Sequence, residues 1–509
     1  MFRLSSFPGW LLLLLLLTAC QTTRVVTTNN PEPVKFTILQ LNDVYEIAPL
    51  EGGKSGGLAR VAGLLRQLEQ ENPNTFAVIA GDFLSPSFMG TLKLDNGERI
   101  AGLQMVETLN ALGMDFATFG NHEFDLSNAA LLEKRMDQCA FTYVSANAHH
   151  VVSATETRPL RQRNQAVPAY GRFPVLAGGK TYYVALVGVV LPFNQQDYIS
   201  YLDVNSSFGQ AVAEARREAD VVLGLTHLSV AEDEALAAAV PGLPLLMGGH
   251  EHQQLSRYVG ETAITKADAN AKTVYIHRIT YYPAQKICRV VSELQPINAQ
   301  TPEDPATAAV VKSWQDRTGE LITQMGYDPE QILTTLKEPL LGTEAVTRSS
   351  QTNYGLLTNQ AIAAQWPDAD VYVFNSGSLR LDDNLSGEVT AYDVLRSFPY
   401  GGPVVRLELT GQQLQQLLDT GETTNWGEGG YLQRYLAEKK GGQWLIKDAP
   451  LSPTKTYQVV LPQFVADGLE ANLGFLKGIP YQTSKAFGPA GQLVKNDIRD
   501  LVIAYLKAP

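Results

Sequence analysis

Five short apolar runs in the first half of the chain are each followed closely by side chains that can bind a metal ion. The runs are rich in β-branched and aromatic residues, which is typical of strands buried on both faces of a sheet. Ligands of α/β sheets gather at the carboxyl ends of strands, so this order predicts an α/β domain with one polar rim. The runs and the side chains that follow them are 34–39 with Asp43, 76–80 with Asp82, 116–119 with Asn121, 221–225 with His227, and 245–247 with His250 and His252.

The chain of 509 residues is too long for one hydrophobic core, so we expect more than one domain. Stretches such as 58–71 and 102–112 fit helices between the strands of the first domain. Three prolines in 295–305 mark a break, and Pro305 suits the first turn of a connecting helix that continues over 306–325. A second domain follows, with predicted strands over 371–374, 404–409 and 457–461 and a closing helix near 497–506.

The N-terminus carries the features of an export signal. Arg3 gives a weakly basic start, and the apolar segment 10–17 is too short to span a bilayer. The residues 17–20, Leu-Thr-Ala-Cys, resemble a bacterial lipobox with Cys20 as the lipidated first residue after cleavage. The alternative is an ordinary cleaved signal with a chance cysteine. The predicted divisions are a lipoprotein signal peptide over 1–20, a flexible tether over 21–33, the first domain over 34–300, a linker helix over 301–335 and the second domain over 336–509.

Composition limits the partners and the compartment. The net charge of -12 argues against a nucleic-acid polymer as the main partner, so an anionic substrate must be met by local arginines and metals. The signal predicts export to the periplasm or the cell surface, with anchoring to a bacterial membrane through Cys20. An exported protein can form disulfides, but the sequence leaves open whether Cys139 and Cys288 pair or are separate buried apolar residues. The oligomeric state is also left open.

The polar rim has the chemistry of a site for two divalent ions. Carboxylates neutralise hard cations and one carboxylate can bridge two of them, while imidazoles raise the affinity for zinc and transition metals. Four of the seven histidines lie in this set or directly beside it. An isolated histidine is more often a buried structural residue, but the ordered set favours a metal site. Two ions held in this way can activate water against a phosphate ester.

The motifs resemble those of a known family. Asp43, Gly81-Asp82, the string 120–123 (Gly-Asn-His-Glu), His227 and the string 249–252 (Gly-His-Glu-His) are similar to the ordered motifs of calcineurin-like metallophosphoesterases. The longer string 121–125 resembles the 5′-nucleotidase family, and the resemblance covers essentially the whole mature chain. It implies an α/β four-layer sandwich of two mixed sheets flanked by helices, followed by a smaller α+β nucleotide-binding domain.

The resemblance also implies individual roles in the first domain. Asp82 is expected to bridge both metals, with Asp43 and His252 on one ion. The other ion is expected to be held by Asn121, His227 and His250. His122 is implied to stabilise the transition state and the leaving oxygen, and Asp125 is implied to orient it, which suits an imidazole near a developing oxyanion.

One residue departs from the family pattern. The family has Asp-x-His in the first motif, but here the string is Asp43-Val44-Tyr45. A phenol is a poor ligand near neutral pH because it must lose a proton with a reference pKa of roughly 10. Either the metal lowers that pKa or water takes the vacant position, so the ion held by Asp43 is in question while the other five ligands remain.

The loops of the second domain offer groups that suit a nucleotide. Arginine suits phosphate or ribose and an aromatic face suits a base, although surface arginines and a packed tyrosine would give the same pattern. By resemblance to the nucleotide-binding loops of 5′-nucleotidases, the substrate contacts are expected to be Arg348, Asn375, Arg380, Tyr400 in place of a stacking phenylalanine, and Phe475 as the second stacking aromatic. The string that usually precedes this second aromatic, Gly-Gly-Asp-Gly, is absent from the sequence.

The predicted function is that of an exported metal-dependent phosphohydrolase. The resemblance implies a 5′-nucleotidase that uses two divalent ions, Zn, Mn, Co or Mg, to activate water and release phosphate from nucleoside monophosphates. Alternatives on the same site are a 2′,3′-cyclic-nucleotide phosphodiesterase/3′-nucleotidase, a UDP-sugar hydrolase or a thiosulfohydrolase. A different class is a catalytically weakened nucleotide-binding surface lipoprotein, which Tyr45 favours and the intact His122 and Asp125 disfavour.

Overall fold

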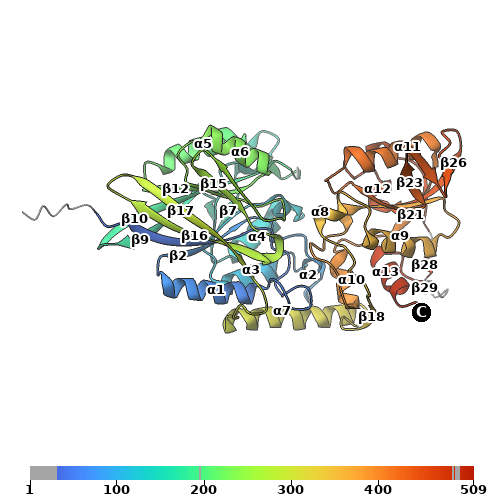
Figure 1. Ribbon diagram of the computed structural model, residues 1–509, viewed down its shortest axis with the longest axis horizontal. Helices are drawn as coiled ribbons and strands as arrows, with labels where there is room; N and C mark the ends of the chain where they lie inside the picture. The colour runs from blue at the N-terminus through green and yellow to red at the C-terminus, as the bar shows by residue number, and fades with distance from the viewer. Residues whose placement is uncertain (1–30, 194–195, 484–485, 488–492, 509) are drawn as a thin grey trace, which may run out of the picture.

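The computed structural model describes residues 31–193, 196–483, 486–487 and 493–508 and consists of two lobes joined by a long helix (Figure 1). Cys20, the predicted signal peptide and most of the predicted tether lie outside the described residues. Helix α7 (Pro305–Gln324) runs beneath both lobes. Asp304 caps α7 by accepting a hydrogen bond from the backbone N–H of Thr307, and Pro305 occupies the first turn, as predicted.

The first lobe contains two six-stranded mixed sheets. In the first sheet, β1 to β4 run parallel to one another. Strand β16 is antiparallel to β1, and β17 is antiparallel to β16. Its order is β17 (Ile287–Pro296), β16 (Thr273–Tyr282), β1 (Val34–Leu41), β2 (Thr75–Ala80), β3 (Phe116–Thr118) and β4 (Thr142–Tyr143). The second sheet has four parallel central strands between antiparallel edges. Its order is β14 (Leu255–Val259), β15 (Thr262–Lys266), β13 (Leu245–Met247), β12 (Val221–His227), β10 (Lys180–Val190) and β9 (Tyr170–Ala177).

The two sheets pack face to face through a buried apolar layer. Phe36 and Val78 of the first sheet belong to the same buried cluster as Phe173 and Leu223 of the second. Helices cover the outer faces, so the lobe has four layers and the predicted fold class is confirmed. These helices are α1 (Leu58–Glu71) and α3 (Leu103–Leu112) on the first sheet and α5 (Val204–Ala215) and α6 (Val230–Ala239) on the second.

The second lobe is built on a five-stranded mixed sheet with helices beside it. The strands are β22 (Leu432–Tyr435), β19 (Val371–Asn375), β26 (Thr456–Pro462), β21 (Val404–Thr410) and β27 (Tyr481–Gln482). The helices include α9 (Asn353–Gln365), α10 (Ala391–Ser397), α11 (Gly411–Asp419) and α13 (Ile498–Leu506). The three strands and the closing helix predicted for this region are therefore present, and the α+β class is confirmed.

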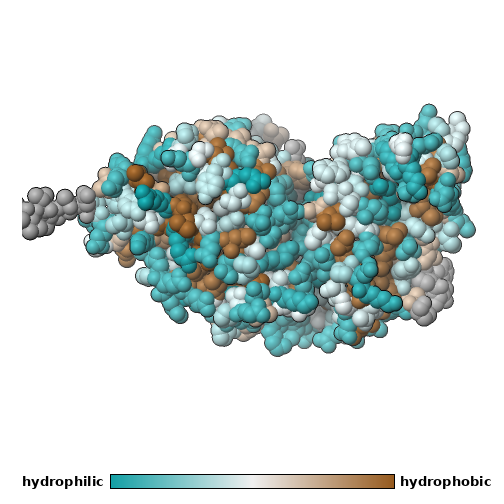
Figure 2. All heavy atoms as spheres, viewed as in Figure 1, coloured by the Kyte–Doolittle hydropathy of each residue, from teal (hydrophilic) through white to brown (hydrophobic). Residues whose placement is uncertain are grey.

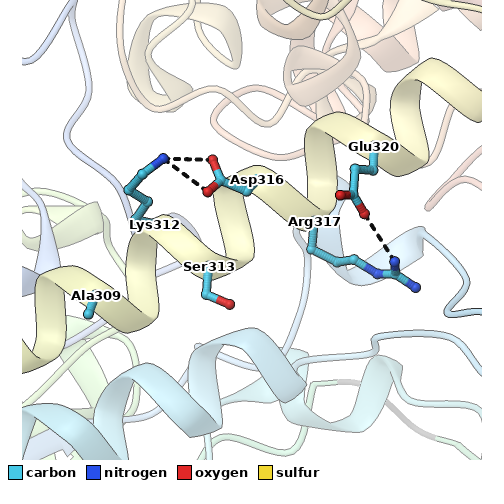
Figure 3. A pocket seen from close by; sticks show the side chains of 6 residues that line it. All are labelled: Ala309, Lys312, Ser313, Asp316, Arg317 and Glu320. Atoms are coloured by element: carbon cyan, nitrogen blue, oxygen red, sulfur yellow. Dashed lines mark hydrogen bonds and ion pairs between the residues drawn. The ribbon is translucent and has the colours of Figure 1, made fainter.

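The face of the molecule shown in Figure 2 is mainly hydrophilic and is hollowed between the two lobes. A shallow cavity of about 510 Å³ beside α7 is lined by residues of that helix alone (Figure 3). Its charges neutralise one another, since Lys312 pairs with Asp316 at 2.9 Å and Arg317 pairs with Glu320 at 3.1 Å. No helix among the described residues is long and apolar enough to cross a membrane. Cys139 and Cys288 are free thiols rather than a disulfide.

Candidate metal centre

The six predicted metal ligands meet at one rim of the first lobe. They follow strands β1, β2, β3, β12 and β13, whose carboxyl ends come together there. Asn121 opens a short 3-10 helix, η1 (Asn121–Asp125), and His227 is the last residue of β12. Five of the six side chains are buried, and His250 is half-buried. Polar residues spread over more than two hundred positions of sequence thus share one interior site.

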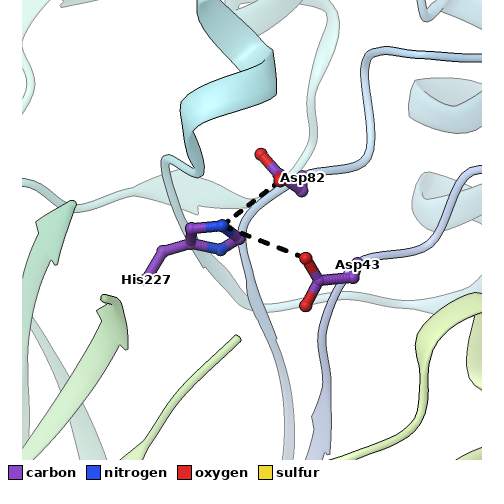
Figure 4. A group of neighbouring side chains, drawn as sticks. All are labelled: Asp43, Asp82 and His227. Atoms are coloured by element: carbon purple, nitrogen blue, oxygen red, sulfur yellow. Dashed lines mark ion pairs between the residues drawn. The ribbon is translucent and has the colours of Figure 1, made fainter. Parts of the chain in front are cut away.

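Two carboxylates and one imidazole form the centre of the group (Figure 4). Ligand atoms of Asp43, Asp82 and His227 all lie within 4.8 Å of one another. His227 Nε2 is 3.2 Å from Asp82 Oδ2 and 3.9 Å from Asp43 Oδ1. His252 approaches from another direction, with Nε2 3.4 Å from Asp43 Oδ1. We refer to Asn121, His227 and His250 as the His227 side, and to Asp43, Tyr45 and His252 as the His252 side; Asp82 contacts both sides.

Each carboxylate uses one oxygen for positioning and presents the other to the cluster. Asp43 Oδ2 accepts hydrogen bonds from Asn42 Nδ2 at 2.8 Å and from the backbone N–H of His250 at 2.9 Å. Asp82 Oδ1 accepts one from the backbone N–H of His122 at 2.7 Å. Asp43 Oδ1 and His227 Nε2 are buried and, among the described residues, form no hydrogen bond. A bound cation requires buried ligand atoms that are not already engaged in hydrogen bonds. The residues therefore fit the metal site predicted from the sequence.

The backbone at the site is held in unusual conformations. Asp43, Asp82, His250 and His252 all have positive φ, at 52°, 56°, 94° and 57°. This left-handed region is uncommon for residues with a side chain, and such residues cluster at functional sites. Close packing demands glycine beside them, because a Cβ at position Gly120 would lie 2.1 Å from Asp82 Oδ1.

The charges of the cluster support one another. Burial raises the pKa of Asp82, but the charges of His227 and His122 outweigh it and hold that pKa below its ordinary value. Burial lowers the pKa of His227, but Asp82 and Asp43 outweigh it and raise the pKa to about 9. The imidazolium of His227 thus partly balances the two carboxylates. A divalent ion would balance them more fully and release that proton.

Glu123 supports the site in a way that the sequence reasoning missed. Its buried carboxylate accepts hydrogen bonds from the backbone N–H groups of Asp82, Phe83 and Gly120 at 2.8, 2.8 and 2.6 Å. It therefore holds the β2 and β3 loops together beneath the cluster. Burial and the neighbouring Asp82 raise the pKa of Glu123 to about 7. Its position inside the 121–125 string could have indicated that Glu123 is important. Nothing in the string, however, distinguishes a metal ligand from a residue that holds the neighbouring loops in place.

His122 and Asp125 form the predicted pair beside the cluster. His122 Nδ1 is 2.8 Å from Asp125 Oδ2, and His122 Nε2 is 2.6 Å from Arg380 Nη2. Arginine can only donate, so Nε2 accepts and the Nδ1–H donates to Asp125. Tyr400 also reaches this pair, donating from its hydroxyl to Asp125 at 3.4 Å. Two predicted substrate contacts from the second lobe therefore lie at the pair.

Tyr45 lies inside the cluster, at the position where the family pattern has histidine. Its hydroxyl donates to Asp82 Oδ2 at 3.3 Å and lies 2.9 Å from His252 Nε2. Burial, reinforced by the charge of Asp82, raises the pKa of this phenol well above its ordinary value. Tyr45 is thus a neutral hydrogen-bonding neighbour, and the His252 side has one metal-binding imidazole fewer than the family pattern supplies.

The remaining predicted substrate contacts are placed less closely together. Arg348 forms an ion pair with Glu344, and Arg380 Nη1 lies 3.9 Å from the same carboxylate. Asn375, at the end of β19, donates to Glu470 at 2.6 Å. Phe475 is half-buried and packs against the apolar core of the second lobe. Arg348 and Arg380 share a partner, whereas Phe475 belongs to the packing of its own lobe.

Comparisons with known proteins agree with this architecture. The family model for calcineurin-like phosphoesterase matches residues 36–254, and the one for the 5′-nucleotidase C-terminal domain matches 332–475. The 5′-nucleotidase of Bos taurus is 24% identical, with 86% of this chain and 83% of that protein covered. The snake venom 5′-nucleotidase of Naja atra is 23% identical, with coverages of 85% and 90%.

Solved structures are similar in fold over most of the chain. The 5′-nucleotidase precursor from Thermus thermophilus has a TM-score of 0.74 at 21% identity, covering 93% of this chain and 96% of that one. The sulfate thiohydrolase SoxB from the same organism has a TM-score of 0.67 at 17% identity, with coverages of 93% and 94%. Fold and site together define a metal-dependent phosphohydrolase. The first domain is a calcineurin-like phosphoesterase domain, and the second is a 5′-nucleotidase C-terminal domain.

Proposed function

We propose that the protein is an exported 5′-nucleotidase that releases phosphate from nucleoside monophosphates with two divalent ions. The observation that carries this proposal is the contact between Arg380 and His122 at 2.6 Å. It brings a guanidinium of the nucleotidase domain to an imidazole that adjoins the carboxylate cluster. A phosphate ester bound there would meet an arginine and an oriented histidine together.

The six rim residues are the proposed ligands. Asp82 would bridge the two ions, with Asp43 and His252 on one and Asn121, His227 and His250 on the other. Asp43 and Asp82 are the only carboxylates among them, so they would carry most of the charge balance. Divalent ions, when bound, supply Lewis acidity toward the phosphate and make water more acidic.

The residues of the chain would orient the ester and handle its leaving group. The Nδ1–H of His122 is held by Asp125, so the imidazole is fixed in one orientation. Its Nε2 faces outward toward Arg380 and would serve the departing nucleoside oxygen once protonated. Arg380 would move from Nε2 to the phosphate, since a phosphate accepts a stronger, charge-assisted hydrogen bond.

Arg348, Asn375 and Tyr400 are the proposed nucleoside contacts. Tyr400 supports this role best, because its side chain remains half exposed while its hydroxyl touches Asp125. A base stacked on this ring would lie close to the metal centre. Phe475 is retained as the second stacking residue on sequence grounds only.

One observation favours a weaker enzyme as a second candidate. Tyr45 bonds both Asp82 and His252 and so competes with a cation for these atoms. A catalytically weakened nucleotide-binding protein would show tight nucleotide binding with turnover near background. The alternative activities would use the same metal centre as the proposed 5′-nucleotidase. They are hydrolysis of a 2′,3′-cyclic nucleotide, a UDP-sugar or a sulfur ester, and they would differ from it only in which ester the second domain binds.

The test is a substrate panel on metal-stripped protein with Mn²⁺, Co²⁺, Zn²⁺ or Mg²⁺ restored. The panel contains AMP, UMP, 2′,3′-cyclic AMP, UDP-glucose and a thiosulfate ester, and His122→Ala serves as the control. We expect the highest kcat/KM for a nucleoside monophosphate, with turnover dependent on added metal. Preference for another ester would reassign the substrate, and metal-independent turnover would overturn the proposal.

Export and anchoring are proposed from residues 1–33. The apolar segment 10–17 and Cys20 support a lipidated N-terminus. Expression in a bacterial host with membrane fractionation tests this, because Cys20→Ala should move the protein from the membrane to the soluble fraction. Continued membrane association of that variant would exclude Cys20 as the anchor.

A further inference from the structure

One histidine of the candidate metal centre contacts both domains. His252 Nε2 faces Asp43 Oδ1 of the first domain at 3.4 Å. Its other ring nitrogen, Nδ1, lies 2.9 Å from Glu344 Oε2 and 3.0 Å from Asp382 Oδ2. Glu344 opens helix α8 (Glu344–Thr347), on the side of the second lobe that faces the first (Figure 1). The ligand atoms of His252, Glu344 and Asp382 lie within 4.8 Å of one another.

This contact is enclosed and held from several directions. The side chains of His252, Glu344 and Asp382 are 6%, 14% and 8% exposed, so water screens them little. Lys272 of the first domain donates from Nζ to the backbone carbonyl of Asp382 at 2.6 Å. Arg348 pairs with Glu344 from within the second domain. The two carboxylates are therefore fixed in place rather than resting on the surface.

His227 shows how the same task is performed within one domain. Its Nδ1 lies 2.7 Å from the backbone carbonyl of Ala80, and its Nε2 faces Asp82. A metal-binding histidine generally donates its second N–H to a carbonyl or carboxylate, which fixes the tautomer and raises the basicity of the ligand nitrogen. For His227 this partner is part of β2, next to Asp82. For His252 the partners come from the other domain.

We propose that Glu344 and Asp382 are positioning residues of the metal centre, so that the second domain sets the cation affinity of the His252 side. This inference rests on the proposed two-metal function. When the second domain is apposed, the carboxylates direct His252 Nε2 toward Asp43. When it moves away, His252 loses both partners and holds a cation more weakly. Coupling of this kind is reciprocal, so a cation on this side stabilises the apposed domains.

Asp382→Asn is the cleanest variant to test the coupling. Asp382 has a φ of 55°, and asparagine tolerates this left-handed conformation, so the backbone is preserved. The variant keeps the carbonyl that Lys272 contacts and removes only the negative charge beside His252. Glu344→Gln is the second variant, because Glu344 also pairs with Arg348 and its change has wider effects. Thermal unfolding of each variant verifies that it folds.

The experiment titrates Mn²⁺ into metal-stripped full-length protein by calorimetry. We expect two sites in the wild type, and in Asp382→Asn a loss of affinity of roughly 10- to 100-fold at one site only. Small-angle X-ray scattering gives a readout independent of affinity. Mn²⁺ should make the wild type more compact, and this effect should be lost in Asp382→Asn.

Tyr392→Phe is the matched control, since Tyr392 also bridges the domains but touches Glu46, at 3.5 Å, rather than His252. It should retain both affinities. Two sites in the wild type with unchanged affinities in both carboxylate variants would overturn the positioning role and leave the metal centre standing. No Mn²⁺ binding by the wild type would instead refute the proposed function itself.

Discussion

The partners that orient His227 and His252 come from different parts of the chain, although both imidazoles face Asp43. On the His227 side, the ring rests on the carbonyl of Ala80, at the end of β2 in the same domain. On the His252 side, the ring is enclosed by Tyr45 and by two carboxylates of the second domain. The first arrangement is complete in one rigid domain. The second depends on how two domains meet, so we expect the two ions to differ in affinity.

The largest effect is expected when Asp82, the residue common to both sides, is changed. Asp82→Asn should reduce hydrolysis to background, a loss of roughly ten-thousandfold or more, because both ions lose their bridging charge. Metal analysis by mass spectrometry, made on the samples used for kinetics, should show both ions weakened. Turnover near the wild-type level at saturating metal would contradict a dinuclear centre.

A second variant separates chemistry from metal binding. His122→Ala should leave both ions bound and lower kcat by roughly a hundredfold to ten-thousandfold, because the leaving oxygen loses its acid. Asp125→Asn should cost less, since the imidazole remains but is poorly oriented. The check is kcat and metal content measured together. Loss of metal in His122→Ala would make that residue a ligand.

Tyr45→His sharpens the difference between the two sides. An imidazole in place of the phenol should tighten the ion of the His252 side more than the other ion, because the Tyr45 hydroxyl bonds directly to His252 and otherwise only to the shared Asp82. Calorimetric titration with Mn²⁺ measures both affinities. Equal tightening of both sites, or none, would show that Tyr45 does not determine the asymmetry.

The smallest expected effect concerns an interdomain contact away from His252. Glu46 is half-buried against Tyr392, and burial raises the pKa of its carboxyl to about 7. Its stabilising contribution is therefore complete below its unfolded pKa of 4.5 and is lost as the pH rises through 7. Between pH 5 and pH 8 the free energy of unfolding should fall less in Glu46→Gln than in the wild type. The difference between the two falls should be no more than about 3 kcal/mol.

Denaturant unfolding at the two pH values checks this prediction, and metal affinity at either pH should remain that of the wild type. A wild type whose stability does not decline between these values would show that Glu46 titrates normally. A change in metal affinity would show that contacts away from His252 also control the His252 side.

Local sequence patterns predicted the first domain well because each ligand directly follows its own strand. The run before Asp82 and the glycine beside it carry enough information to place that carboxylate at the carboxyl end of a buried strand. The helices over 58–71 and 306–325 were likewise visible, the latter from its proline start. Patterns of this kind involve only neighbouring residues, so they can be recognised in the sequence without knowledge of the folded structure.

The missing parts of the site depend on distant segments of the chain. Glu344 and Asp382 follow no motif, and only the meeting of two domains brings them to His252. Glu123 lies inside a motif, but its bonds to the loop of β2 become apparent only when the strands are adjacent. Phe475 was chosen from its place late in the sequence, and its packing against the core of the second domain was not readable from neighbouring residues.

The most direct test of the account is anomalous diffraction from crystals grown with Mn²⁺. We predict two manganese peaks roughly 3.5–4 Å apart, with Asp82 between them. One should lie against His227 and the other against Asp43 and His252, with the lower occupancy at the second when Mn²⁺ is limiting. A single peak at the rim, or peaks that do not contact Asp82, would contradict the two-metal centre on which the account depends.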